Sequence, residues 1–182
     1  MVKGLKEFES IRRCLKPVVF ALLFVVIQLS LYYLLDPEMT FTIDEKLNES
    51  GDDLLPSLIA ITPISVLIEE LGLRVFPHFI CIGLIQGWPR FRDLLRHARS
   101  PEEEKLDVFM IPLFGVVNGV IHLSNVVTAS PINILKYSFT HFVGGAYLGS
   151  IYLRHGFRQV YATHLLYNMM VFGLFYIPLP FW

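Results

Sequence analysis

The sequence is poor in charged residues and in cysteine. Asp, Glu, Lys and Arg make up 17% of its 182 residues, whereas about a quarter is usual in soluble domains. Its two cysteines, Cys14 and Cys81, are too few for a disulfide framework and form no CxxC pair. Fifteen basic residues against sixteen acidic ones leave no basic excess for a phosphate backbone, so we do not expect nucleic-acid binding.

Long apolar segments are what the chain has instead. Hydrophobic residues make up 54% of the sequence, and the mean hydropathy is +0.54. Residues 17–35 form an uncharged run long enough to cross a bilayer as a helix. Further apolar segments cover residues 54–88, 106–129, 132–153 and 160–182. The pattern predicts an all-α fold, a polytopic transmembrane helical bundle of about five to six membrane helices, in one integral-membrane domain over 1–182.

The charged residues outside these segments predict an orientation in the membrane. Residues 1–16 and 89–105 are basic, whereas the 36–53 segment is acidic. Because basic segments stay in the cytoplasm, we expect a cytoplasmic N-terminus, an external 36–53 loop and a multi-pass location in the cell membrane. We expect the first apolar run to be retained, because no small-residue cleavage site follows it, as one would after a signal peptide.

The second apolar segment, 54–88, is too long for a single perpendicular crossing. Two crossings there would reverse the orientation of everything that follows and would move the basic 89–105 segment outside. We therefore expect one long helix that is tilted, extends into the cytosol, or is interrupted at Pro63 or Gly72.

Three charged residues lie together inside that segment. A charge near the bilayer centre costs at least about 2.5–3.5 kcal/mol, so Glu69, Glu70 and Arg74 need a role. Glu70 and Arg74 are four residues apart and share a helix face, so we expect them to pair. Glu69 points elsewhere and is left without a partner in sequence, as a general base requires.

Two histidines inside apolar segments are each paired with an asparagine at a spacing of four. Asn118 and His122 share one face, and His164 and Asn168 share another. A carboxylate can take a proton from water that a histidine orients, and a histidine with an amide can stabilise an oxyanion. Glu69, His122, His164 and Asn168 therefore suit the hydrolysis of an acyl bond. His141 has no such partner, and we expect it to be an ordinary core residue.

Other hydrolytic mechanisms have less support in the sequence. It contains neither GxSxG nor HExxH. We expect no metal or other cofactor, although the residue types leave open a zinc ion held by Glu69, His122 and His164.

These motifs resemble those of the CPBP family, the CAAX proteases and bacteriocin-processing enzymes also called Abi. The family's EExxxR motif matches Glu69 to Arg74, and its HxxxN-type motif matches His164 to Asn168. Its FxxxH motif matches His122, with Asn118 in place of the usual Phe. The resemblance covers about residues 54–170, the expected catalytic core.

The resemblance implies a metal-independent intramembrane glutamate protease. Glu69 would activate water with help from His122, and His164 with Asn168 would form the oxyanion hole. Glu70 and Arg74 would support the site, and Asn118 would make the cavity wetter. The substrate would be a membrane-associated or prenylated peptide. CAAX tails, bacteriocin leaders and regulatory membrane proteins are equally compatible with the sequence.

Two other functions stay open on the sequence. A non-catalytic membrane immunity protein or partner-binding protein would retain the same fold without the chemistry. A small transporter or proton relay would also need ionisable residues within the membrane, but the sequence has no visible inverted repeat. Nothing in the sequence indicates an oligomeric state.

Overall fold

The structure, a computed structural model, describes residues 2–35, 54–86, 104–123 and 131–176. Those residues form helices joined by short turns and contain no strand, which confirms the predicted all-helical class for them. In chain order the elements are α1 (Val2–Leu35), α3 (Leu54–Glu70), η1 (Leu71–Val75), α4 (Phe76–Gln86), α7 (Asp107–His122), α8 (Pro131–His155) and α9 (Phe157–Tyr176). The predicted external loop 36–53 lies outside the described residues, as does most of the basic 89–105 segment.

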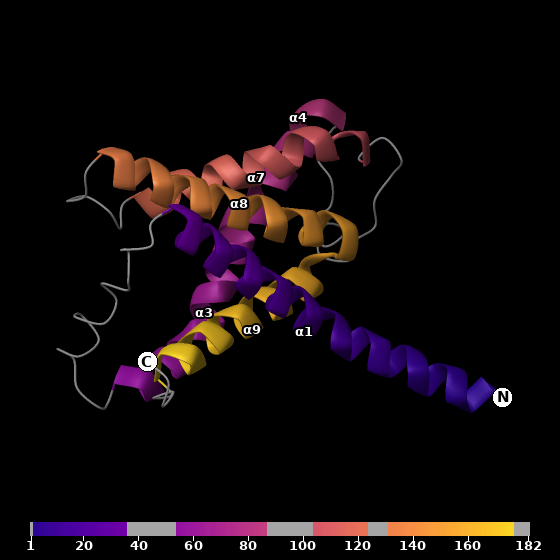
Figure 1. Cartoon of the computed structure of the whole chain (residues 1–182). Helices are drawn as coiled ribbons and strands as arrows, with labels where there is room; N and C mark the ends of the chain where they lie inside the picture. The colour runs from indigo at the N-terminus through magenta and orange to yellow at the C-terminus, as the bar shows by residue number, and fades with distance from the viewer. Residues whose placement is uncertain (1, 36–53, 87–103, 124–130, 177–182) are drawn as a thin grey trace.

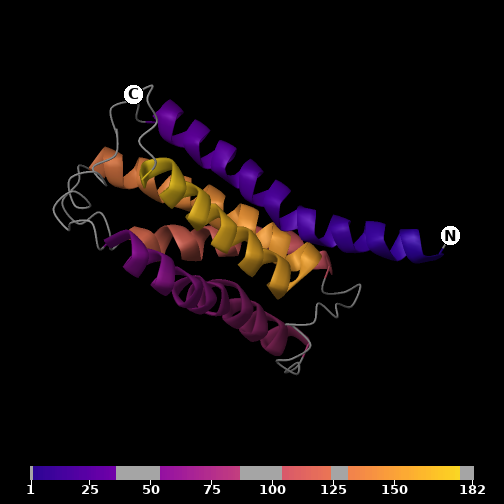
Figure 2. The same ribbon diagram turned by 90° about the horizontal axis from the view of Figure 1, so that it is seen from below.

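The long second apolar segment is a continuous helical rod, as expected. α3, η1 and α4 follow one another without a break, and Figure 2 shows them as one magenta rod. The irregular point is η1, a π-helical stretch that contains Gly72, whereas Pro63 lies inside α3. A π-helical turn holds an extra residue and is frequent at functional sites. Glu70, the last residue of α3, directly precedes this stretch, and Arg74 lies within it.

The turn between α8 and α9 depends on a glycine. Gly156 has a φ of 82°, in the left-handed region, and its amide donates a hydrogen bond to the Tyr152 carbonyl at 2.8 Å. Glycine adopts this conformation without the Cβ penalty, and helices commonly end at such a residue. The chain therefore reverses directly after α8, and α9 packs back against it.

Seen from below, the helices lie roughly along one direction (Figure 2), whereas in the view of Figure 1 α1 crosses α9. α9 packs against α1, α3 and α8, and Figure 2 shows it between α1 and the α3–α4 rod. α1 is antiparallel to α8, because Phe20 stacks on His155 while the Gln28 amide donates to the Thr140 carbonyl at 3.3 Å. Residues of α9 are therefore placed in the interior of the bundle.

The closest helix packing joins α7 to α8 through small residues. Gly115 on α7 has no room for a side chain, because an added Cβ would lie 2.8 Å from Phe142. On α8, a Cβ at Gly145 would collide with Asn118. Gly119 lies one turn after Gly115 on α7, and Gly149 lies one turn after Gly145 on α8, in the same interface. Glycines at a spacing of four let two backbones approach closely, as in many membrane helix pairs.

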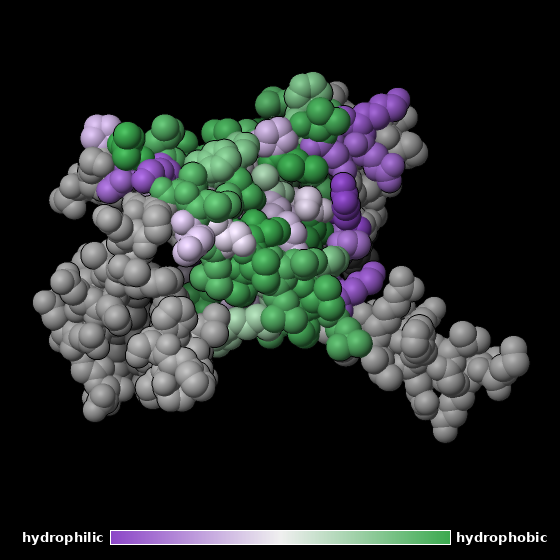
Figure 3. Space-filling model, in the orientation of Figure 1, coloured by the Kyte–Doolittle hydropathy of each residue, from purple (hydrophilic) through white to green (hydrophobic). Residues whose placement is uncertain are grey.

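The surface of the bundle is apolar and its interior is partly polar. Large hydrophobic side chains are exposed on α1, α3, α4, α7 and α8, and Leu84, Val108 and Phe109 are exposed to 75%, 75% and 73%. Figure 3 shows this apolar surface across the middle of the bundle, with most hydrophilic residues at one edge, on the right, and a smaller group at the upper left. The buried polar and charged residues are Gln28, Thr62, Glu70, Arg74, His78, Asn118, Thr140, Thr163 and His164.

One helix among the described residues is long and apolar enough to cross a membrane by itself. It is the stretch Leu15–Leu35 of α1. Because this stretch lies near the N-terminus, a signal sequence would have the same length and hydropathy. Asp107–His122 is a shorter apolar helix.

Candidate functional site

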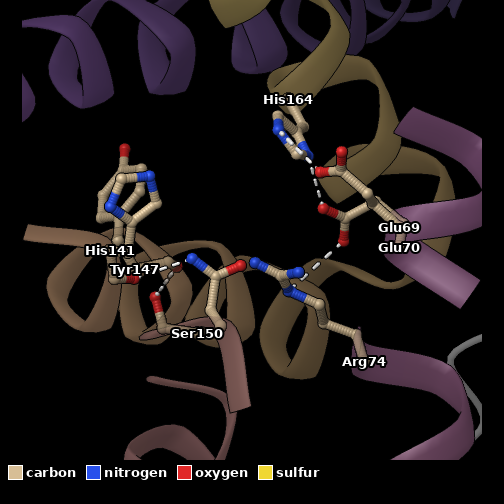
Figure 4. A network of polar contacts seen from close by, with 8 residues as sticks. Glu69, Glu70, Arg74, His141, Tyr147, Ser150 and His164 are labelled. Carbon is tan, nitrogen blue, oxygen red and sulfur yellow. Dashed lines mark hydrogen bonds and ion pairs between the residues drawn. The ribbon is translucent and has the colours of Figure 1, made fainter. Parts of the chain in front are cut away.

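The three charged residues of the second apolar segment and His164 meet where α3 packs against α9. Glu69 and Glu70 form the end of α3, and Arg74 follows in η1. His164 comes from α9 and points toward both carboxylates (Figure 4). The structure thus brings together groups that lie about 90 residues apart in the sequence.

Glu70 makes the shortest polar contact of the site. Its carboxylate is 0% exposed, and its Oε1 lies 2.7 Å from Nδ1 of His164. Its other oxygen, Oε2, lies 3.5 Å from Nε of Arg74. The expected pairing of Glu70 with Arg74 is therefore confirmed, and His164 is a second partner that the spacing in sequence does not indicate.

Glu69 is the more accessible of the two acids. Its side chain is 33% exposed, whereas that of Glu70 is fully buried. Its Oε1 accepts a hydrogen bond from the Ser65 hydroxyl at 3.5 Å, and its Oε2 lies 3.8 Å from Nε2 of His164. A separation of 3.8 Å is too long for a direct hydrogen bond. Glu69 is thus free of any tight ion pair among the described residues and is the more exposed of the two acids.

Arg74 is buried but weakly bonded. Its side chain is 0% exposed, and none of its three guanidinium nitrogens has a hydrogen-bond partner within the described part of the chain. An unpaired charge in a protein interior is strongly unfavourable, so a nearby opposite charge is essential. We conclude that Arg74 acts mainly by balancing the charge of Glu70.

His122 lies at the end of α7, close to the same interior. Its ring packs on that of His141 with centroids 4.4 Å apart and planes tilted by 37°. This contact joins the end of α7 to α8.

Asn118 connects α7 to α8. It is buried, and its amide nitrogen donates a hydrogen bond to the His141 carbonyl at 2.8 Å. Its side chain also lies against Gly145 of α8. The amide group that we expected to make a cavity wetter is thus engaged in helix packing.

Asn168 makes no hydrogen bond to His164 in the structure, and its role in an oxyanion hole stays a prediction. It follows His164 by one turn on α9 and is half-buried, and its side chain makes no hydrogen bond to any other residue that the structure describes. Both ring nitrogens of His164 face carboxylates. The structure therefore brings His164 together with Glu69 and Glu70 instead of with Asn168.

Sequence reasoning missed two contributors to this region. Ser65 lies four residues before Glu69, so its spacing would have indicated a contact on one helix face. The Nδ1 of His141 donates to the Tyr137 carbonyl at 2.9 Å, and its ring packs on that of Tyr137. Its contact with His122 joins two helices, and nothing in the spacing along the chain indicates it.

No family model, curated protein or solved structure matches this chain. Among the residues described, no group of three or more His, Cys, Asp and Glu side chains is placed to hold a metal ion. What bears on function is therefore the arrangement of the site. Two adjacent carboxylates face one imidazole, with a guanidinium beside them, in the interior of a bundle whose outer surface is apolar.

Proposed function

We propose that this protein is a multi-pass membrane peptidase of the CPBP type, which hydrolyses a peptide bond of a membrane-associated or prenylated peptide. The observation that carries the proposal is the meeting of Glu69, Glu70 and His164 inside an apolar-surfaced bundle. Such a cluster has little reason to exist in a lipid-facing bundle unless it serves a function. The EExxxR and HxxxN-type motifs, which resemble those of the family, contribute those three residues.

The inverted distribution of polar residues supports a membrane bundle. In water, the many exposed hydrophobic side chains would favour aggregation, whereas in lipid they are well solvated. α8 has 25 residues and α9 has 20, which at 1.5 Å per residue gives about 37 Å and 30 Å, enough for a hydrocarbon core of about 30 Å. Both helices carry polar residues that the bundle buries, and these lower their hydropathy.

The hydrophilic edge supports the orientation expected from the sequence. The residues just before α7, the end of α8 and the start of α9 expose charged groups there: Glu104, Lys105, Arg154 and Arg158. The net basic character of this edge supports a cytoplasmic position for it, on the same side as the N-terminus.

Labelling with a membrane-impermeant maleimide on intact cells tests this orientation. In a protein whose Cys81 is replaced by serine, we expect Ser50→Cys to be labelled from outside and native Cys14 to be labelled only after lysis. Labelling of Cys14 in intact cells would contradict the orientation.

In the proposed reaction Glu69 is the general base. A water oxygen bonds to the carbonyl carbon of the scissile peptide while one water proton passes to the Glu69 carboxylate. The C–N bond then breaks, and the leaving amine takes that proton from Glu69. The products are a carboxylic acid and an amine, and Glu69 is again ionised. Because His164 is engaged by carboxylates, we assign the developing oxyanion to His122 and Asn168.

The test uses purified protein in lipid nanodiscs and measures the hydrolysis of two fluorogenic probes. One probe is a farnesylated peptide, and the other is an unprenylated transmembrane peptide. General-base removal lowers rates by about 100- to 10,000-fold, so Glu69→Gln should lose at least 100-fold on the probe that is cleaved. Glu104→Gln, an exposed acid at the hydrophilic edge, is the matched control and should retain full activity.

Two results would overturn the proposal. Cleavage that survives Glu69→Gln in a folded protein would remove the glutamate mechanism. Absence of cleavage of both probes, together with full complementation of a deletion strain by Glu69→Gln, would favour the non-catalytic partner-binding function.

A further inference from the structure

His164 lies between two carboxylates at unequal distances. Its Nδ1 is 2.7 Å from Oε1 of Glu70, a short hydrogen bond, and its Nε2 is 3.8 Å from Oε2 of Glu69. The first distance is typical of a charge-assisted bond. The second is too long for a direct hydrogen bond, and one water placed beside the two atoms at about 2.8 Å from each bridges them.

The contact with Glu70 fixes where the imidazole proton resides. An ionised carboxylate can only accept hydrogen bonds, so Nδ1 of His164 must carry the hydrogen. In a neutral imidazole the other nitrogen then has a lone pair and is an acceptor. In the neutral form of His164, Nε2 and the Glu69 carboxylate are two acceptors that face each other, and a molecule with two hydrogens to donate satisfies both.

The orientation of both carboxylates agrees with this arrangement. Glu70 turns Oε1 toward His164 and Oε2 toward Arg74. Glu69 turns Oε2 toward His164, while its Oε1 accepts from the Ser65 hydroxyl. Each acid thus has one oxygen directed at another side chain, Arg74 for Glu70 and Ser65 for Glu69, and its other oxygen facing the imidazole.

We propose that Glu70 is a positioning residue that sets the tautomer of His164, and that the attacking water binds between Nε2 of His164 and Oε2 of Glu69. This inference rests on the proposed hydrolytic function. It differs from the role that the sequence motifs assign to His164, because the histidine here orients the nucleophile and does not stabilise the oxyanion. Glu69 is still the base, and the water donates one hydrogen to each partner before its proton moves to Glu69.

Glu70→Gln tests the positioning role with little change in shape. Arg74 only donates, so it favours the amide oxygen of the new glutamine, and the amide nitrogen then faces His164. That nitrogen donates to Nδ1 and moves the imidazole hydrogen to Nε2, where it points at Glu69 and displaces the water. The corresponding change in a Ser-His-Asp triad lowers turnover about 10,000-fold through the wrong tautomer. We expect a loss in kcat of at least about 100-fold.

Glu70→Asp is the conservative partner of that variant. It keeps the negative charge and the acceptor for Nδ1, so it should retain clearly more activity than Glu70→Gln, with KM little changed in both. Equal losses in the two variants would show that Glu70 serves only to pack the interface, and would overturn the inference.

A direct readout of the tautomer does not depend on catalysis. In nanodiscs, ¹⁵N-histidine NMR distinguishes protonated from unprotonated ring nitrogens, and the His164 signals are assigned by comparison with His164→Gln. We expect Nδ1–H in the wild type and Nε2–H in Glu70→Gln. A wild-type ring protonated on Nε2 alone, or on both nitrogens, would overturn the inference.

The two proposals fail in different ways. Hydrolysis that survives Glu69→Gln would refute the peptidase while the NMR result stood. A wild-type Nε2–H tautomer with an inactive Glu69→Gln would leave the peptidase in place and refute the role given to Glu70.

Discussion

Two interfaces of this bundle are held together by different forces. α7 and α8 approach closely through glycines, and a Cβ at Gly115 would lie 2.8 Å from Phe142. α3 and α9 meet through charged side chains, with Glu70 bonded to His164. In lipid, where apolar burial no longer drives association, close packing and polar contacts are the two available means of joining helices.

One interface consists of close backbone packing, and the other contains ionisable groups. Glycine packing is satisfied within the protein and offers no group for chemistry. The α3–α9 contact leaves Glu69 one-third exposed and its second oxygen 3.8 Å from His164, a geometry that stability alone does not require. Substitutions in the first interface should therefore alter stability, whereas those at Glu69 should alter activity.

The largest change in stability is expected where a charge is left unpaired. Arg74→Met removes the guanidinium beside the fully buried Glu70, and breaking a buried pair typically costs about 3–5 kcal/mol. Chemical unfolding in detergent micelles measures this loss. The double variant Glu70→Gln with Arg74→Met should recover most of it, and a double variant as unstable as the single one would contradict the pairing.

Gly145→Ala should disturb the α7–α8 interface and leave the α3–α9 contact in place. The added methyl group collides with Asn118, and overpacking of this kind costs about 1–3 kcal/mol. The free energy of unfolding should fall by that amount, while the Nδ1–H tautomer expected for His164 stays as in the wild type. A stable Gly145→Ala protein would show that the helices do not approach as closely as described.

Tyr147→Phe should have a smaller effect at a third contact. The Tyr147 hydroxyl donates to the Phe20 carbonyl at 2.9 Å and ties α8 to α1. Loss of one such bond costs about 0.5–1.5 kcal/mol. A thermal unfolding series measures the change, and Tyr161→Phe, whose hydroxyl bonds to the Pro63 carbonyl at 3.2 Å, is the matched control that loosens α9 from α3 instead.

Gly72→Ala should have the smallest effect and should be stabilising. No atom lies within 4 Å of a Cβ added there, and alanine is favoured over glycine in helices by up to about 1 kcal/mol. A destabilised Gly72→Ala protein would show that η1 needs the freedom of glycine and would assign the π-helical stretch a conformational role.

The sequence predicted the helices better than their contacts. The apolar segments and their order follow from hydropathy, and even the irregularity at Gly72 could be expected from the length of 54–88. The Glu70–Arg74 pair follows from a spacing of four. Such arguments hold within one helix, because its geometry is fixed by the backbone.

Contacts between helices could not be derived in this way. From spacing alone, Glu70 is expected to pair with Arg74, and His164 is expected to share a helix face with Asn168. In the structure, the rotation of α9 against α3 turns His164 toward both Glu69 and Glu70. Likewise the pairing of His122 with His141 depends on the register of α7 against α8. That register is set by glycines at a spacing of four, Gly115 and Gly119 on α7 against Gly145 and Gly149 on α8. The glycine spacing is visible in the sequence, but it does not indicate which helix each pair packs against.

A double-mutant cycle between Glu69 and His164 on the hydrolysis rate tests the account most directly. If the two residues hold one water, either single variant destroys the same arrangement, so Glu69→Gln with His164→Gln should lose hardly more activity than Glu69→Gln alone. If the two losses multiply, Glu69 and His164 act independently, and the site described for this protein is wrong.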